Sequence, residues 1–182
     1  MDDLVNFWRI ASRLKSTPRM GWKQRLRLEK VESVADHSFG VAILALFEGE
    51  KRGYDIGSLL KLSLIHDLEE TVTGDLTPRD KRRVSKTSLS RMRTGAVLSI
   101  FGTLPKHSQR RYLKLSNDLR TGRTREARLV KSLDKLEMAL QAKEYERRGI
   151  DRRKLADFYR SATRQVSDPA LKRALKKIVS SD

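Results

Sequence analysis

Residues 31–53 read VESVADHSFGVAILALFEGEKRG, and this stretch decides the fold. On a helix built from these residues, apolar side chains occupy more positions than a single amphipathic face requires. Gly53 marks the expected end of that helix. A helix that is apolar on most sides is typical of the centre of a protein. The stretch therefore predicts a central helix, on which His37 shares a face with Val34 and Val41.

The composition of the 182-residue chain favours an all-α fold. Aromatic residues make up only 6% of the chain, and Gly and Pro are sparse inside the apolar stretches. The 38% of hydrophobic residues can fill one core, and the 35% of charged residues leave a heavily charged surface. We expect one helical-bundle domain over residues 1–150, with C-terminal helices over 151–182 packed on the same domain.

The other expected helices carry apolar residues at helical spacing, and several begin at an aspartate that can cap the helix. Asp55, Asp151 and Asp168 are predicted N-caps. The stretch TGDLTPRDK is predicted to be a loop, because Gly74 and Pro78 are typical turn residues. The helices are expected at residues 2–16, from 55 toward 70, and at 84–101, 105–119, 123–148, 151–165 and 168–180.

The charge balance and the absence of cysteine limit the possible functions. Forty Lys and Arg oppose 23 Asp and Glu, and the net charge of +17 favours polyanions, phosphorylated substrates or anionic surfaces as partners. Without cysteine, any metal must be held by His and carboxylate groups. No stretch of 18 apolar residues predicts a membrane span, and the N-terminus does not resemble a signal peptide. We expect a cytoplasmic protein without membrane contact.

A second stretch, LIHDLEETVTGD at residues 64–75, places His66 beside Asp67. His66 shares a helical face with Leu59 and Leu62, so two of the three histidines, His37 and His66, lie on apolar faces. Either could be a core histidine bonded to a carbonyl group. A carboxylate in apolar surroundings is costly unless it is paired, protonated or bound to a metal, and this favours a metal site.

Asp134 interrupts the apolar run LVKSLDKLEMAL at residues 129–140. It could be a surface acid beside Lys131 or Lys135. Together with His37, His66 and Asp67 it would complete a set of two imidazoles and two carboxylates, which suits Mn, Fe, Co, Ni or Zn. One divalent ion held in this way would serve a hydrolytic reaction.

Three phrases carry a resemblance to a known family: ESVADHS, HDLEETVTGDLTPRDK and DKLEMALQAKEY. Their order and spacing resemble the HD-domain metal-dependent phosphohydrolases, and among these the 5′-deoxynucleotidase branch. The resemblance covers about residues 4–150. It implies an all-α HD domain and removal of phosphate from deoxyribonucleoside 5′-monophosphates.

The resemblance also implies roles for individual residues. His37, His66, Asp67 and Asp134 match the metal ligands of the family. Glu70 matches the carboxylate that orients or deprotonates the attacking water. Asp75 matches a second carboxylate near the leaving-group oxygen or the metal-bound water. Taken without the resemblance, Asp75 reads as an N-cap or a loop-stabilising residue.

The predicted substrate-binding residues surround Trp22, which matches a tryptophan near the nucleotide in the family. Gly21 stands where the bacterial 5′-deoxynucleotidases have an arginine. Arg19, Lys23 or Arg25 could supply the missing positive charge, and the sequence does not choose among them.

The preferred function is removal of the 5′-phosphate from ribo- or deoxyribonucleoside monophosphates, and the resemblance also implies a homodimer. One alternative is an HD-type phosphodiesterase or nucleoside-triphosphate hydrolase. Another is a basic helical protein that binds nucleic acid through residues 79–93, 105–128 and 147–154, which are rich in Lys and Arg.

Overall fold

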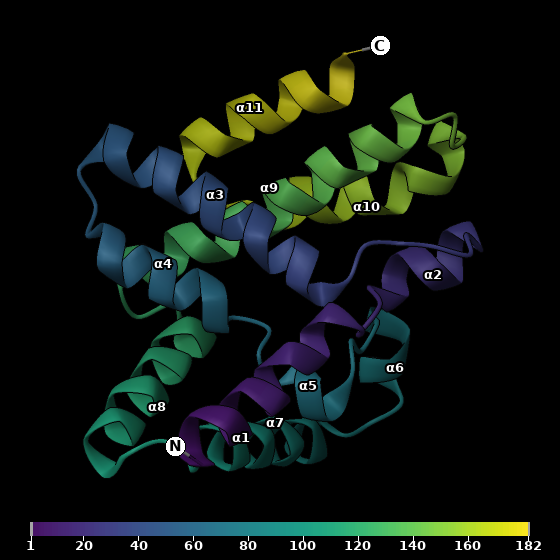
Figure 1. Ribbon diagram of the computed structural model, residues 1–182. Helices are drawn as coiled ribbons and strands as arrows, with labels where there is room; N and C mark the ends of the chain where they lie inside the picture. The colour runs from purple at the N-terminus through teal and green to yellow at the C-terminus, as the bar shows by residue number, and fades with distance from the viewer. Residues whose placement is uncertain (1, 182) are drawn as a thin grey trace. The chain divides into compact units, whose positions relative to one another are not determined.

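The computed structural model describes residues 2–181, which form helices and turns with one isolated antiparallel bridge between Pro18 and Ser33 (Figure 1). The expected all-α fold is confirmed. By its internal contacts the chain divides into two units. The first comprises the residues up to Ser38 and Leu64–Arg120, and the second comprises Phe39–Ser63 and the residues from Thr121 on.

The first unit holds most of the short helices. These are α1 (Asp2–Ala11), the 3₁₀ helix η1 (Ser12–Lys15), α2 (Met20–Leu26), the start of α3 (Val34–Arg52), α5 (Glu70–Thr73), α6 (Pro78–Arg82), α7 (Lys86–Phe101) and most of α8 (Lys106–Thr121). Its buried side chains include Trp22, Val34, Leu68, Ile100 and Phe101.

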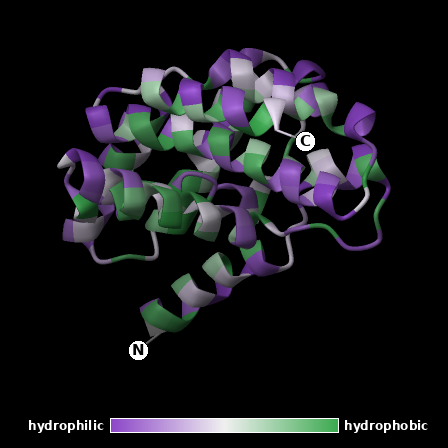
Figure 2. Ribbon diagram, turned by 90° about the horizontal axis from the view of Figure 1, so that it is seen from above, coloured by the Kyte–Doolittle hydropathy of each residue, from purple (hydrophilic) through white to green (hydrophobic). Residues whose placement is uncertain are grey.

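The second unit is built on a long helix. It holds the rest of α3, most of α4 (Ile56–Ile65), α9 (Arg125–Arg147), α10 (Arg152–Gln165) and α11 (Pro169–Ser180). Both α10 and α11 pack on α9, burying Leu155, Tyr159, Leu171 and Leu175. Figure 2 shows hydrophilic and hydrophobic residues together on most helices, as expected when each helix buries one face.

Three predicted helix starts are confirmed by capping contacts. Asp55 precedes α4 and accepts a hydrogen bond of 3.2 Å from Ser58 N. The Asp151 carboxylate accepts a hydrogen bond from Arg153 N, and Asp168 accepts from the backbone of Ala170 and Leu171. These bonds satisfy amides that have no partner inside the helix.

The predicted loop at residues 73–81 was wrong in part, because α6 begins inside it. Thr77 and Asp80 form a reciprocal capping box, and Pro78 occupies the first helical turn. Pro78 therefore starts a helix and does not extend the loop, because its fixed φ suits the first helical position.

The helix of residues 31–53 was expected to be central and apolar on most sides, and the structure buries only one of its sides. His37, Val41 and Ala45 on one side of α3 are buried. The opposite side exposes four large apolar residues, Phe39, Ile43, Leu46 and Phe47.

Candidate metal centre

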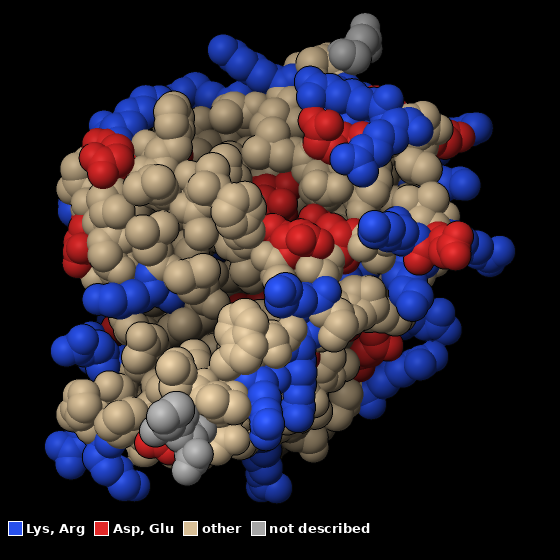
Figure 3. Space-filling model, in the orientation of Figure 1, with Lys and Arg blue, Asp and Glu red and all other residues tan. Residues whose placement is uncertain are grey.

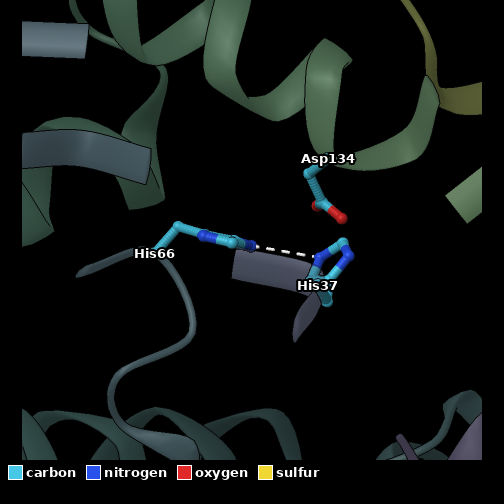
Figure 4. Close-up of side chains that lie close together, drawn as sticks. All are labelled: His37, His66 and Asp134. Atoms are coloured by element: carbon cyan, nitrogen blue, oxygen red, sulfur yellow. Dashed lines mark hydrogen bonds between the residues drawn. The ribbon is translucent and has the colours of Figure 1, made fainter. Parts of the chain in front are cut away.

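His37 and His66 meet inside the first unit. His37, in the first turn of α3, is fully buried, and its Nε2 lies 3.3 Å from Nε2 of His66 (Figure 4). The ring centroids are 5.2 Å apart with an interplanar angle of 62°. His66 follows the end of α4, in a tight turn in which Leu68 N donates to Ile65 O. The sequence predicted a continuous helix here, and the turn instead aims His66 at His37.

Asp67 brings a carboxylate oxygen to the same place. Its Oδ2 lies 3.3 Å from His66 Nε2 and 3.7 Å from His37 Nε2. Atoms that bind one ion at about 2.1 Å lie roughly 3.0–3.4 Å apart in an octahedral or tetrahedral arrangement. Two imidazole nitrogens and one carboxylate oxygen at this spacing fit a divalent transition-metal ion.

Asp134 lies on α9, in the second unit (Figure 4). Its Oδ2 lies 2.9 Å from Lys135 Nζ, which is the surface pairing that the sequence allowed. The role of Asp134 as a fourth ligand stays a prediction.

Glu70 is the first residue of α5 and is buried. Its Oε2 makes no hydrogen bond to any atom of residues 2–181. Burial raises the pKa of Glu70 to about 9, and the negative charges of Asp67 and Asp75 act in the same direction. Arg19 and Lys81 oppose this shift. A buried carboxylate without a donor is costly, so this oxygen is available to a ligand or a water molecule.

Asp75 follows α5 and anchors its loop to α2. Its Oδ2 accepts a hydrogen bond of 2.7 Å from the backbone N–H of Met20, the first residue of α2. The loop can turn here because Gly74 has a φ of 70°, which a residue with a side chain rarely adopts. The loop-stabilising role of Asp75 is thus visible, and its catalytic role stays a prediction.

Arg19 lies among three carboxylates. Its NH1 is 3.4 Å from Asp67 Oδ2 and 3.9 Å from Asp75 Oδ1, and its Nε is 3.8 Å from Glu32 Oε1. Trp22 Nε1 donates to the same Glu32 oxygen at 2.7 Å. Of the three cations proposed from the sequence, Arg19 is the one that the structure brings to Asp67.

The other residues proposed for substrate binding lie differently. Trp22 is 1% exposed, so its ring packs in the core. Lys23 and Arg25 are exposed on α2. Gly21 lies inside α2, one residue after Met20.

Sequence reasoning missed three contributors to the site. Glu32 links Trp22 to Arg19, and Lys81 acts on Glu70 through its charge. Glu69, expected to face solvent, is largely buried, and its Oε1 lies 3.8 Å from Arg93 Nε on α7. The two arginines lie far from these acids in the chain, so no local pattern could have revealed the pairs.

Comparison with known proteins identifies the family. The family model described as HD domain matches residues 11–174. The chain belongs to the HD-domain family. The match runs past residue 150, and the predicted boundary of the HD domain at that position stays a prediction.

The resemblance to the 5′-deoxynucleotidase branch of the HD-domain family is confirmed by curated relatives. The mouse 5′-deoxynucleotidase HDDC2 is 34% identical over 168 residues, covering 92% of this chain and 82% of the mouse protein. The fission yeast 5′-deoxynucleotidase hdd1 is 36% identical over 159 residues, covering 85% of this chain and 78% of its own.

Solved structures of similar proteins share the HD-domain fold. A conserved hypothetical protein from Pyrococcus furiosus superposes with a TM-score of 0.77 at 31% identity, covering 96% of each chain. A Pyrococcus horikoshii protein gives 0.78 at 28% identity, covering 96% of this chain and 98% of its own. Among the described residues, no helix has the length and apolar character needed to span a membrane.

Proposed function

We propose that this HD-domain protein is a divalent-metal-dependent phosphohydrolase that removes the 5′-phosphate from deoxyribonucleoside monophosphates. The observation that carries the proposal is the convergence of His37 Nε2, His66 Nε2 and Asp67 Oδ2 beside Glu70, whose Oε2 has no partner among residues 2–181. The 5′-deoxynucleotidase names of the curated relatives support the reaction and the substrate class.

The proposed ligands of the ion are His37, His66, Asp67 and, from α9, Asp134. A divalent ion held by these groups supplies a Lewis acid, which lowers the pKa of a water molecule and polarises a phosphoryl oxygen. Mn, Co, Ni, Fe and Zn all suit the donor set, and the identity of the ion is open to experiment.

The chain's own groups perform the remaining steps. Glu70 is assigned the role of orienting the attacking water and accepting its proton, because its buried Oε2 has no hydrogen-bond partner among residues 3–181 and the charge of Asp67 acts on it. Arg19 positions Asp67 and Asp75 and offsets negative charge as it builds on the phosphoryl oxygens. Asp75, or water, supplies a proton to the leaving 5′-oxygen.

The test is a phosphate-release assay on metal-stripped protein reloaded separately with Mn²⁺, Co²⁺, Ni²⁺, Zn²⁺ or Mg²⁺. The substrates are ribo- and deoxyribonucleoside mono-, di- and triphosphates. We expect release from deoxyribonucleoside monophosphates with at least one ion and none without metal. No release from any monophosphate would overturn the proposal.

The two rival functions give different results in related assays. A phosphodiesterase would cleave a cyclic or dinucleotide substrate, and a triphosphate hydrolase would act on the triphosphates only. A protein that only binds nucleic acid would bind DNA or RNA in a salt-dependent manner and release no phosphate.

A homodimer is part of the proposal, and we assign its interface to α3 and not to the C-terminal helices. The apolar faces of the C-terminal helices are buried on α9. The exposed apolar face of α3, formed by Phe39, Ile43, Leu46 and Phe47, is the surface that we propose for the dimer. Light scattering of the wild type and of Phe39→Ser/Phe47→Ser tests this interface. The expected cytoplasmic location also stays a prediction, open to localisation of a tagged protein.

A further inference from the structure

Residues 79–93, here called the basic segment, read RDKRRVSKTSLSRMR. Seven of these fifteen residues are Lys or Arg, and one is acidic. The segment covers most of α6 and the first half of α7, both in the first unit. Its net charge of +6 is thus concentrated in one part of one unit.

The positive charges of the basic segment are not neutralised locally. Asp80 is engaged in its capping box, where Thr77 N donates to it at 3.0 Å. Arg93 lies 3.8 Å from Glu69. Among the side chains of residues 3–181, no carboxylate lies within ion-pairing distance of the remaining cations, which are Arg79, Lys81, Arg82, Arg83, Lys86 and Arg91. By contrast, Arg152, Arg153 and Arg160 on α10 all pair with acids.

The basic segment lies beside the carboxylates of the proposed site. Asp75 precedes the start of α6 by three residues. Helix α7 packs on α5, which carries Glu70. Figure 1 shows α5, α6 and α7 as neighbours, and Figure 3, in the same orientation, shows blue Lys and Arg side chains gathered over the region of α6.

A shallow, open surface along α7 is formed by exposed residues of that helix between positions 86 and 98. Two cations, Lys86 and Arg91, line it together with the hydroxyl groups of Thr87, Ser90 and Thr94. Cations and hydroxyl groups are the usual side-chain partners of phosphate oxygens in nucleic acids. From Lys86 to Thr94 the helix rises about 12 Å, so these side chains are spread along the helix and can contact more than one phosphate group.

We propose that the basic segment binds the phosphodiester groups of a short single-stranded oligonucleotide whose 5′-terminal phosphate is the group removed. This inference rests on the proposed function and extends its substrate class. The oxygen of water forms a bond to phosphorus, and the bond between phosphorus and the 5′-oxygen breaks. The 5′-oxygen keeps the electron pair and takes up a proton, so the products are a 5′-hydroxyl oligonucleotide and inorganic phosphate.

The distribution of charge favours this substrate over a mononucleotide. A monophosphate places its single charged group at the proposed metal ligands, and leaves the cations along α7 without a partner. An oligonucleotide adds one phosphate charge for each further nucleotide. Each phosphate that is bound displaces counterions, so the gain in affinity depends on salt.

The experiment compares phosphate release by the manganese-loaded enzyme from 5′-phosphorylated thymidine oligomers of one, two, four and eight nucleotides. The test variant is Arg82→Gln/Arg83→Gln/Lys86→Gln, in which three exposed cations of the segment are neutralised. The matched control is Lys172→Gln/Arg173→Gln/Lys176→Gln, which removes three exposed cations from α11. A second measurement follows the binding of a fluorescent 5′-hydroxyl octamer, which requires no hydrolysis.

We expect kcat/KM of the wild type and of the control to rise roughly tenfold from one to four nucleotides. A fourfold increase in salt should remove most of this rise, since about three phosphate contacts are involved. The test variant should keep its activity on the monophosphate and lose the rise with length. Equal kcat/KM for one and four nucleotides in the wild type would overturn the inference, as would the same loss in both variants.

The two proposals fail in distinguishable ways. If no substrate releases phosphate but the octamer binds through the basic segment, the proposed function fails and the binding surface stands. If the monophosphate is hydrolysed and the octamer does not bind, the proposed function stands and the oligonucleotide substrate is excluded. Binding to phosphatidylserine vesicles, without binding to the octamer, would assign the basic segment to membranes instead.

Discussion

Two largely buried glutamates, Glu70 in the first unit and Glu146 in the second, have carboxyl groups whose pKa values are shifted in opposite directions. The carboxylate of Glu146, near the end of α9, has three partners. Tyr159 Oη donates to it at 2.8 Å, Arg152 Nη1 donates at 2.9 Å, and Lys143 Nζ lies 3.5 Å away. Burial raises its pKa, but the bonds from Tyr159 and Arg152 outweigh burial, so the pKa lies below its usual range. For Glu70 burial prevails, and nearby acids raise the pKa to about 9.

The difference separates a group with a structural role from one for which we propose a catalytic role. Lys143 also donates to Ser181 O, and Arg152 to Val179 O, so the Glu146 network fixes the end of α11 to α9 and α10. Every charge in that network has a partner, which makes its burial tolerable. Around Glu70, by contrast, the negative charges of Asp67 and Asp75 act on its carboxyl group, and its Oε2 has no hydrogen-bond donor. An arrangement that is unfavourable by itself indicates a site that is completed by a cation and a substrate.

Asp67→Ala should give the largest effect. It removes the oxygen that both histidines approach, so we expect loss of the bound metal and of all measurable phosphate release. Elemental analysis after dialysis and the monophosphate assay measure the two losses. The control is Asp157→Ala, which breaks an exposed pair with Arg160. Full metal content in Asp67→Ala would exclude this residue as a ligand.

Glu70→Gln should lower turnover on the monophosphate by roughly 10²–10⁴-fold, the range for a positioned acid–base group. The metal should be retained, because the variant leaves His37, His66 and Asp67 unchanged. Steady-state kinetics together with metal content separate this result from that of Asp67→Ala. Wild-type turnover in Glu70→Gln would show that another group handles the water.

Glu146→Ala should lower the stability of the protein and leave its turnover unchanged. Lys143 and Arg152 would lose their shared partner, and we expect the free energy of unfolding to fall by about 2–4 kcal/mol. Turnover per folded molecule should not change. Urea unfolding and active-site titration measure the two quantities, with Glu144→Ala as the control because Glu144 pairs with Arg147 at the surface. A loss of turnover larger than the loss of folded protein would contradict a purely structural role.

The metal-free protein should also lose stability as the pH rises. The pKa of Glu70 is raised in the folded state to about 9 from 4.5, so its contribution is complete below pH 4.5 and is lost between pH 4.5 and about 9. At pH 8, metal-free Glu70→Gln should therefore be more stable than the metal-free wild type by ~1 kcal/mol or more. Urea unfolding at pH 4.5 and pH 8 tests the sign. Equal stability of the two proteins at both pH values would rule out the shift.

Periodicity and capping residues predicted the long helices well, because these signals are local. Asp151 and Asp168 cap the helices that they were expected to start. The turn at His66 and the helices α2 and α6 were missed. All three are only a few residues long, too short for a periodic pattern, and in α6 the capping box of Thr77 and Asp80 was read as part of a loop.

The outer face of α3 shows the limit of hydropathy as evidence of burial. Its apolar residues predicted an internal helix, yet Phe39 and Phe47 are 67% and 65% exposed. Hydropathy states which side chains favour burial, but it does not state whether a partner surface is present within the same chain.

The sequence by itself determined the helical class and the family, and it proposed His37, His66, Asp67 and Glu70 as site residues, because periodicity and motif spacing are properties of a short stretch of chain. Only the tertiary structure decided that Arg19, and neither Lys23 nor Arg25, lies against Asp67. It also decided that Glu32 holds the Trp22 indole and that Glu69 pairs with Arg93. These pairs join residues 10 to 48 positions apart. Their distances depend on how whole helices pack, which no local pattern of residues encodes.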